Sequence, residues 1–248
     1  MASTSETGHA KNVATFEDLI SFCTGYGAQY NPSKAALKVP ALNTLLAACN
    51  TALQAVKTAK TAHDNATNAR EVTFKPLKPL STKVINGLSA TDATSQTVDD
   101  AKSTNLKIQG RRATKVDKPD EAAKAAGVPV AKIASTSQQS YDKLIDHFAQ
   151  LIATLTAEPK YLPNENELKL PALNALLADL KTKNTATINA YTALSNARIA
   201  RDKALYGEGN GMVDVAKDVK LYIKSVFGAS SPQFKQVSGL KFKKREGD

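Results

Sequence analysis

Residues 30–46 read YNPSKAALKVPALNTLL and residues 161–177 read YLPNENELKLPALNALL. The chain therefore contains nearly the same stretch twice, and this stretch is called here the repeated phrase. Ten positions are identical when the stretches are aligned with an offset of 131 residues. A thinner match continues to Arg70 and Arg201, and FEDLISF at Phe16 resembles YDKLIDH at Tyr141. The sequence therefore predicts an internal duplication.

Each copy of the phrase carries a proline where a helix can begin. A proline in the first helical turn needs no N–H partner, and it keeps the preceding residue extended. Leucines and other apolar residues follow Pro40 and Pro171 at helical spacing. We therefore expect two long spine helices, over about residues 40–72 and 171–205, and interpret the phrase as a helix-start device.

Shorter helices are expected on both sides of each spine helix. Apolar residues at helical spacing run from Phe16 in the first copy and from Tyr141 to Leu155 in the second. The proline-containing stretch FKPLKP precedes a third helical pattern, LSTKVINGLSA, in the first copy. The glycine-rich stretch YGEGNG precedes the pattern MVDVAKDVKLYIKSVFG in the second copy. The predicted fold class is all-α: an elongated, pseudo-two-fold helical bundle with about three helices per copy.

The predicted organisation is a flexible N-terminus at 1–15, copy 1 at 16–112, a linker at 113–135, copy 2 at 136–245 and a tail at 246–248. The linker includes PDEAAKAAG, which has the composition of a short helix. Each copy closes with an apolar and basic phrase, NLKIQGRR or SGLKFKKR, expected to be an extended tail on the bundle. Both copies are expected to pack as one bundle.

The net charge of +10 is spread evenly along the chain. Residues 1–131 hold 16 Lys and Arg against 11 Asp and Glu, and residues 132–248 hold 17 against 12. The clustered basic residues are Arg111, Arg112, Lys241, Lys243, Lys244 and Arg245, at the ends of the copies. They are candidate contacts for nucleic acid or an acidic partner, and the alternative is a pair of solvated ends.

Cysteines, histidines and glycines form no recognised site. Cys23 and Cys49 lack CxxC spacing and are predicted to be buried free thiols. The histidines, His9, His63 and His147, are scattered and make no metal-binding motif. The run Gly207, Gly209 and Gly211 superficially suggests a phosphate loop, but no Lys-Ser or Lys-Thr follows, and a helix–helix turn is the favoured interpretation.

One trio has the composition of a metal or acid–base site. Asp142 and Asp146 lie one helical turn apart, and His147 follows directly. The other copy does not repeat these residue types, and single carboxylates on a helix usually face water. A metal-dependent hydrolase is kept as a second alternative, while the main prediction is no enzyme and no cofactor.

Localisation and partners are predicted from what the sequence lacks. The first 15 residues have no apolar core of the kind a signal peptide needs, and no run approaches a membrane span. We therefore expect a cytoplasmic protein with no transmembrane segment. The expected function is structural or partner-binding work in an assembly, with a protein partner, self or other, and weak non-specific nucleic-acid binding is the alternative.

The second copy resembles a known group of bacterial proteins. The residues that carry the resemblance are YLPNENELKLPALNALLADLKTKN and ALSNARIARDKALYGEGNGMVDVAKDVKLYIKSVFGASSPQFKQVSGLKF. They are similar to a widespread group of uncharacterised helical proteins, mostly from Bacteroidota, which the first copy matches only loosely. The group has no established activity, so the resemblance implies a bacterial helical protein and transfers no functional residue.

Overall fold

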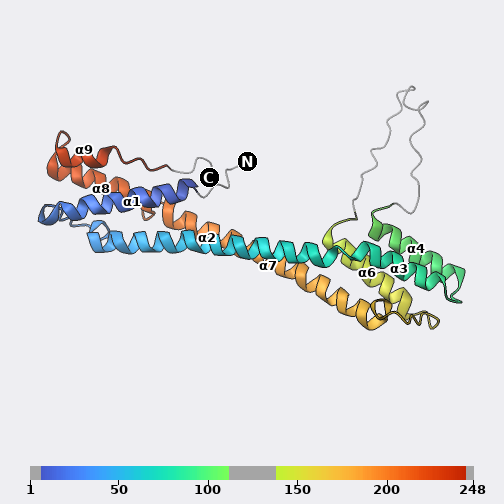
Figure 1. Ribbon diagram of the computed structural model, residues 1–248. Helices are drawn as coiled ribbons and strands as arrows, with labels where there is room; N and C mark the ends of the chain where they lie inside the picture. The colour runs from blue at the N-terminus through green and yellow to red at the C-terminus, as the bar shows by residue number, and fades with distance from the viewer. Residues whose placement is uncertain (1–6, 112–137, 244–248) are drawn as a thin grey trace, which may run out of the picture. The chain divides into compact units, whose positions relative to one another are not determined.

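The structure, a computed structural model, describes residues 7–111 and 138–243 (Figure 1). All the regular elements in these ranges are helical, which confirms the predicted all-α class. The chain divides into two compact units. Unit 1 comprises Met1–Asp64 and Asn189–Asp248, and unit 2 comprises Asn65–Ile188.

The helices follow the predicted spine closely. In chain order they are α1 (Thr7–Gly25), α2 (Val39–Phe74), α3 (Leu77–Ser89), α4 (Ser95–Gln109), α6 (Tyr141–Thr156), α7 (Leu170–Tyr206), α8 (Met212–Phe227) and α9 (Pro232–Ser238). Three short 3-10 turns are η1 (Gly27–Gln29), η2 (Ala35–Leu37) and η3 (Asn166–Leu168). The long helices α2 and α7 confirm the two predicted spine helices.

Both copies of the repeated phrase form the same internal hydrogen bond, from a tyrosine hydroxyl to a backbone carbonyl. The hydroxyl of Tyr30 donates to the carbonyl of Leu37 at 2.7 Å, and that of Tyr161 donates to the carbonyl of Leu168 at 2.9 Å. Both tyrosines and both leucines are buried. A tyrosine seven residues before a leucine is thus a structural requirement of the loop that leads into each long helix.

Removing either hydroxyl is expected to destabilise its unit. Tyr30→Phe or Tyr161→Phe leaves a buried carbonyl without its partner, so each should lower the free energy of unfolding by about 1–2 kcal/mol. Urea denaturation followed by circular dichroism measures this. The matched control is Tyr191→Phe at an exposed position, which should change stability by less than about 0.5 kcal/mol. Equal effects at all three positions would refute the role of the loop bond.

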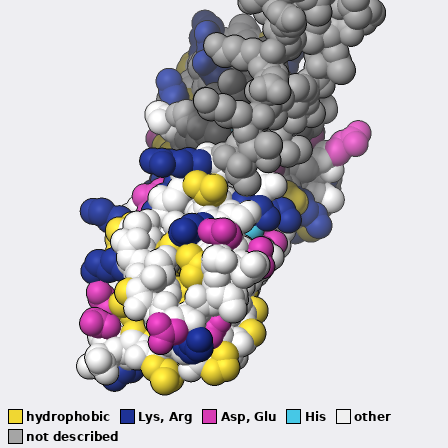
Figure 2. All heavy atoms as spheres, turned by 90° about the vertical axis from the view of Figure 1, so that its right-hand side faces the viewer, with side chains coloured by type: hydrophobic (Ala, Val, Ile, Leu, Met, Phe, Trp, Pro, Cys, Tyr) yellow, Lys and Arg dark blue, Asp and Glu magenta, His cyan; other side chains and the backbone are white. Residues whose placement is uncertain are grey.

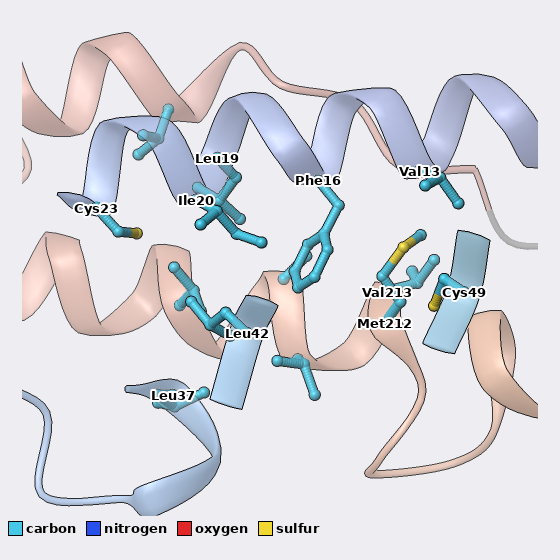
Figure 3. Packing of buried hydrophobic residues seen from close by; sticks show 14 of the residues in the cluster. Val13, Phe16, Leu19, Ile20, Cys23, Leu37, Leu42, Cys49, Met212 and Val213 are labelled. Atoms are coloured by element: carbon cyan, nitrogen blue, oxygen red, sulfur yellow. The ribbon is translucent and has the colours of Figure 1, made fainter. Parts of the chain in front are cut away.

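The core of unit 1 forms between α1, α2 and α8. Apolar side chains of α1 point inward at helical spacing, among them Phe16 and Leu19, neither of which is exposed. Figure 3 shows Phe16 and Leu19 directed towards Leu42 of α2, and Val13 directed towards Met212 of α8. Alternation of the apolar stripe with polar residues therefore fixes which face of α1 is buried.

Unit 2 has a separate core built in the same manner. The stripe of α6 buries Leu144, Phe148, Leu151 and Leu155, as its spacing predicts. α4 packs against α6 and α3, and Ile108 of α4 is fully buried between them. The unit therefore has its own hydrophobic cluster.

Each unit combines helices from both predicted copies. Unit 1 joins α1 and the start of α2 with α8 and α9, and unit 2 joins α6 and the start of α7 with α3 and α4. In unit 1 the ammonium of Lys34 lies 2.7 Å from a carboxylate oxygen of Asp218 on α8. In unit 2 the ammonium of Lys83 on α3 lies 2.8 Å from Glu167 in η3. These parallel contacts agree with the duplication, which stays a prediction.

The structure differs from the expected elements at three places. Residues 7–15, expected to be flexible, begin α1, because His9 and Asn12 are buried against later parts of unit 1. Most of NLKIQGRR is helical as the end of α4, not an extended tail, and Gly110 ends that helix with φ 78°. A fourth helix thus follows the three predicted ones in each copy, α4 in one and α9 in the other. The linker 113–135, PDEAAKAAG and the tail 246–248 lie outside the described residues.

Both thiols are buried and free, as predicted. Burial raises the pKa of Cys23 and of Cys49 to about 11, and burial raises the pKa of Tyr161 to about 12. Each of these groups binds its proton more tightly in the folded chain than in the unfolded chain. The stability they support is complete below about pH 9 and is lost as the pH rises towards about 12.

Alkaline destabilisation is therefore expected to depend on these residues. The free energy of unfolding should fall between pH 9 and pH 11, and the fall should be smaller in Cys49→Ala than in the wild type. Urea titrations at fixed pH values measure it. An equal pH dependence in the two proteins would show that Cys49 does not contribute.

Among the described residues, one helical stretch, 39–89, is long and apolar enough to cross a membrane by length and composition alone. Only 17% of its most apolar window is buried. A single such stretch is also found in proteins that do not enter membranes.

Candidate functional site: a lysine cluster on unit 1

The six basic residues singled out in the sequence do not all fall in one unit. Arg111 belongs to unit 2, directly after α4. Lys241 and Lys243 are exposed residues of unit 1, in the non-helical stretch after α9. Arg112, Lys244 and Arg245 lie outside the described residues. A joint patch of both ends therefore stays a prediction.

The trio on α6 does not converge on one point. Asp142 accepts a hydrogen bond from the side-chain amide of Asn184 at 2.7 Å, and Asp146 pairs with Lys143 at 3.5 Å. The ring of His147 is buried, and its Nε2 has no hydrogen-bond partner among the described residues. Burial, with the nearby Lys107 charge, lowers the pKa of His147. Within 7–111 and 138–243, no group of three His, Cys, Asp or Glu side chains could hold a metal.

Within the part of the chain that the structure describes, charge is distributed unevenly between the two units. Among the described residues, unit 1 has 14 Lys and Arg against 7 Asp and Glu, and unit 2 has 12 against 10. Figure 2 shows a face of unit 2 on which basic, acidic and hydrophobic side chains are interspersed. Among the described residues, the excess of positive charge is therefore larger in unit 1 than in unit 2.

Six lysines of unit 1 come from adjoining elements. We call Lys217, Lys220, Lys224, Lys235, Lys241 and Lys243 the lysine cluster. The first three lie on one stripe of α8, because their spacing is three and four residues. α8 packs against α9, which supplies Lys235, and the stretch after α9 supplies the last two.

Aromatic rings join the parts of the cluster. The ammonium of Lys220 lies 5.4 Å from the ring centroid of Phe242, and that of Lys224 lies 5.8 Å from the ring centroid of Phe234. Both distances fall within the range of cation–π attraction. Lys220 also donates a hydrogen bond to the carbonyl of Leu240, and its partial burial lowers its pKa. These contacts keep α8, α9 and the following stretch together.

Among the described residues, two carboxylates of α8 pair with lysines at or near the cluster. Asp214 pairs with Lys217 at 3.2 Å, and Asp218 pairs with Lys34, which directly precedes η2, at 2.7 Å. Two apolar side chains of α8 are exposed beside the lysines: Leu221 is 64% exposed and Val226 is 45% exposed. The arrangement presents positive charge with apolar contact points, which suits an acidic surface better than a small anion.

Most of the cluster was not singled out from the sequence. Lys241 and Lys243 are among the candidates of the sequence analysis, whereas the four lysines of α8 and α9 are not. Their signal was the i, i+3, i+7 spacing of Lys217, Lys220 and Lys224 on a helix whose other face is apolar. The rings that approach these lysines belong to residues 10 to 22 positions later, so only the fold reveals the grouping.

Comparison with known proteins gives no match: no family model, no curated protein and no solved structure is significantly similar to the chain. The resemblance to bacterial helical proteins therefore stays a prediction.

Proposed function

We propose that the protein is a non-enzymatic, partner-binding protein of an assembly, and that the lysine cluster of unit 1 is its contact surface for an acidic protein. The observation that carries the proposal is the grouping of lysines from three adjoining elements of unit 1, whose described residues include 14 basic against 7 acidic ones. Electrostatic complementarity of this kind raises the rate of association and selects the partner.

Nucleic acid is the second candidate, favoured by the same charge. Single-stranded nucleic acid is usually bound through exposed aromatic rings on which bases stack. Phe234 and Phe242 are only partly exposed, and lysine ammonium groups lie over both rings. The exposed Leu221 and Val226 offer nothing to a phosphate backbone. An acidic protein surface with apolar residues among its carboxylates can contact both the lysines and the exposed Leu221 and Val226.

Charge reversal tests the surface with a control of equal net charge. Lys217→Glu, Lys224→Glu and Lys241→Glu together should weaken binding to a poly-glutamate peptide at low salt by at least about tenfold, since each reversed charge turns attraction into repulsion. The control reverses Lys75, Lys102 and Lys181 of unit 2 and should change binding less than about threefold. Equal losses in the two triple variants would show that only net charge matters.

A salt titration separates the two candidates. Binding to random duplex DNA through about four phosphates would give a log–log salt slope of about −3 to −4. We expect that changing Arg111, Arg112, Lys243 and Lys244 to serine leaves binding to the poly-glutamate peptide detectable, because five of the six lysines of the cluster remain. DNA binding that is tighter than peptide binding at 150 mM salt and is abolished by these four changes would favour the nucleic-acid function instead.

A further inference from the structure

Residues 239–243, called here the C-terminal segment, lie on unit 1 as a peptide lies in a binding groove. The segment is not helical. Leu240 and Phe242 pack against the core of unit 1, and the alternate residues Lys241 and Lys243 are exposed. Alternation of inward and outward side chains is the pattern of an extended chain.

A buried asparagine of α1 binds the main chain of this segment twice. The side-chain amide of Asn12 donates to the carbonyl of Lys243 at 2.8 Å, and its Oδ1 accepts the N–H of the same residue at 3.1 Å. Asn12 is only 3% exposed. Both bonds are to the backbone, so they recognise an extended strand whatever its side chain.

Other polar groups fix the asparagine and the far end of the segment. The amide of Asn12 also donates to the hydroxyl of Tyr206 at 3.2 Å, and that hydroxyl lies 2.7 Å from Nδ1 of His9. Lys220 of α8 donates to the carbonyl of Leu240. The groove thus offers polar contacts at both ends of the segment and apolar contacts between them.

We propose that this groove, formed by α1, Tyr206 and α8, is a peptide-binding site whose partner is the C-terminal segment of a second copy of the chain. A second copy carries the same residues and can make the same backbone bonds and apolar contacts. Exchange of identical segments between copies needs no new interaction. The groove shares Lys220 with the lysine cluster, and the segment carries Lys241 and Lys243 of that cluster, but the exchange does not depend on the cluster binding an acidic partner.

The chain's own segment competes with any exchanged one. A tethered ligand reaches an effective concentration of about millimolar, so the groove is filled in cis at ordinary protein concentrations. Gly239 links α9 to the segment.

Two variants of the full chain test the exchange by complementation. The first variant, Leu240→Ser with Phe242→Ser, leaves the groove intact and removes the two apolar side chains by which the C-terminal segment binds it. The second, Asn12→Asp, keeps the ligand and damages the groove, because a carboxylate accepts the N–H of Lys243 but cannot donate to its carbonyl. Neither variant alone should associate. Their equimolar mixture should form a one-to-one dimer, measured by light scattering after size-exclusion chromatography.

A peptide gives a second readout that does not require a dimer. A synthetic peptide of residues 238–243 should bind the Leu240→Ser, Phe242→Ser variant at least about tenfold more tightly than the wild type, whose groove is occupied. Adding Asn12→Asp to that variant should abolish the gain. Circular dichroism identifies variants that fail to fold, and Phe242→Ser alone replaces the first variant in that case. Absence of peptide binding to the folded, vacated groove, or a mixture that stays monomeric, would overturn the proposal.

Discussion

Replacing Phe148 by alanine is expected to lower the free energy of unfolding of unit 2 by about 3–5 kcal/mol. Phe148 is fully buried in the middle of the α6 stripe. Its removal loses the transfer free energy of a phenyl ring and leaves a cavity among residues that cannot close over it. Phe16→Ala should have an effect of the same size on unit 1, where Phe16 is also fully buried.

Urea denaturation with amide hydrogen exchange resolved by segment measures the two effects separately. Phe148→Ala should speed exchange first in α6 and α4, and Phe16→Ala should speed it first in α1 and α8. The control is Leu162→Ala, because Leu162 is 80% exposed and its truncation should cost less than about 0.5 kcal/mol. If Phe148→Ala cost no more than Leu162→Ala, the core assigned to unit 2 would be wrong.

Gly211→Ala should be strongly destabilising in the turn between α7 and α8. A Cβ at Gly211 would lie 2.5 Å from the backbone nitrogen and oxygen of Gly207. Backbone atoms cannot rotate away as a side chain does, so the turn must shift, at a cost of about 3 kcal/mol. Gly209 has φ 73° with open space around it, and Gly209→Ala should cost only about 1 kcal/mol.

Thermal unfolding monitored by circular dichroism measures both changes. The larger loss at Gly211 than at Gly209 follows from a turn in which the glycines allow close backbone approach and a left-handed residue. α7 ends at Tyr206 and α8 begins at Met212, so the glycine run is the helix–helix turn that the sequence predicts. Equal and small losses at the two positions would contradict this geometry.

The spine helices could be predicted because each carries a start signal and a long apolar stripe. Pro40 and Pro171 lie in the first turns of α2 and α7, and the helices continue to Phe74 and Tyr206. The sequence pattern does not predict α4, because the helix is mostly polar and two of its three buried residues, Ala101 and Thr104, are small. Its signals were local: the hydroxyl of Thr94 caps the N–H of Thr97, and Gly110 ends the helix.

The lysine cluster could be predicted only in part because it depends on which helices meet. When charge is counted along the chain, each half has a net charge of +5, and this even distribution argues against a basic patch. Each unit instead combines the beginning of one copy with the end of the other. The contacts of Lys220 with Phe242 and Lys224 with Phe234 arise from packing between elements, which sequence spacing does not encode.

Zero-length carbodiimide cross-linking in lysate of the source cell, followed by peptide mass spectrometry, tests the central claim most directly. The reagent joins a lysine only to a carboxylate in direct contact. We expect links from Lys217, Lys224, Lys235 and Lys241 to acidic residues of a partner protein, lost at high salt, with few links from Lys75 or Lys181 of unit 2. Links distributed equally over exposed lysines of both units would contradict the assignment of the lysine cluster as the contact surface.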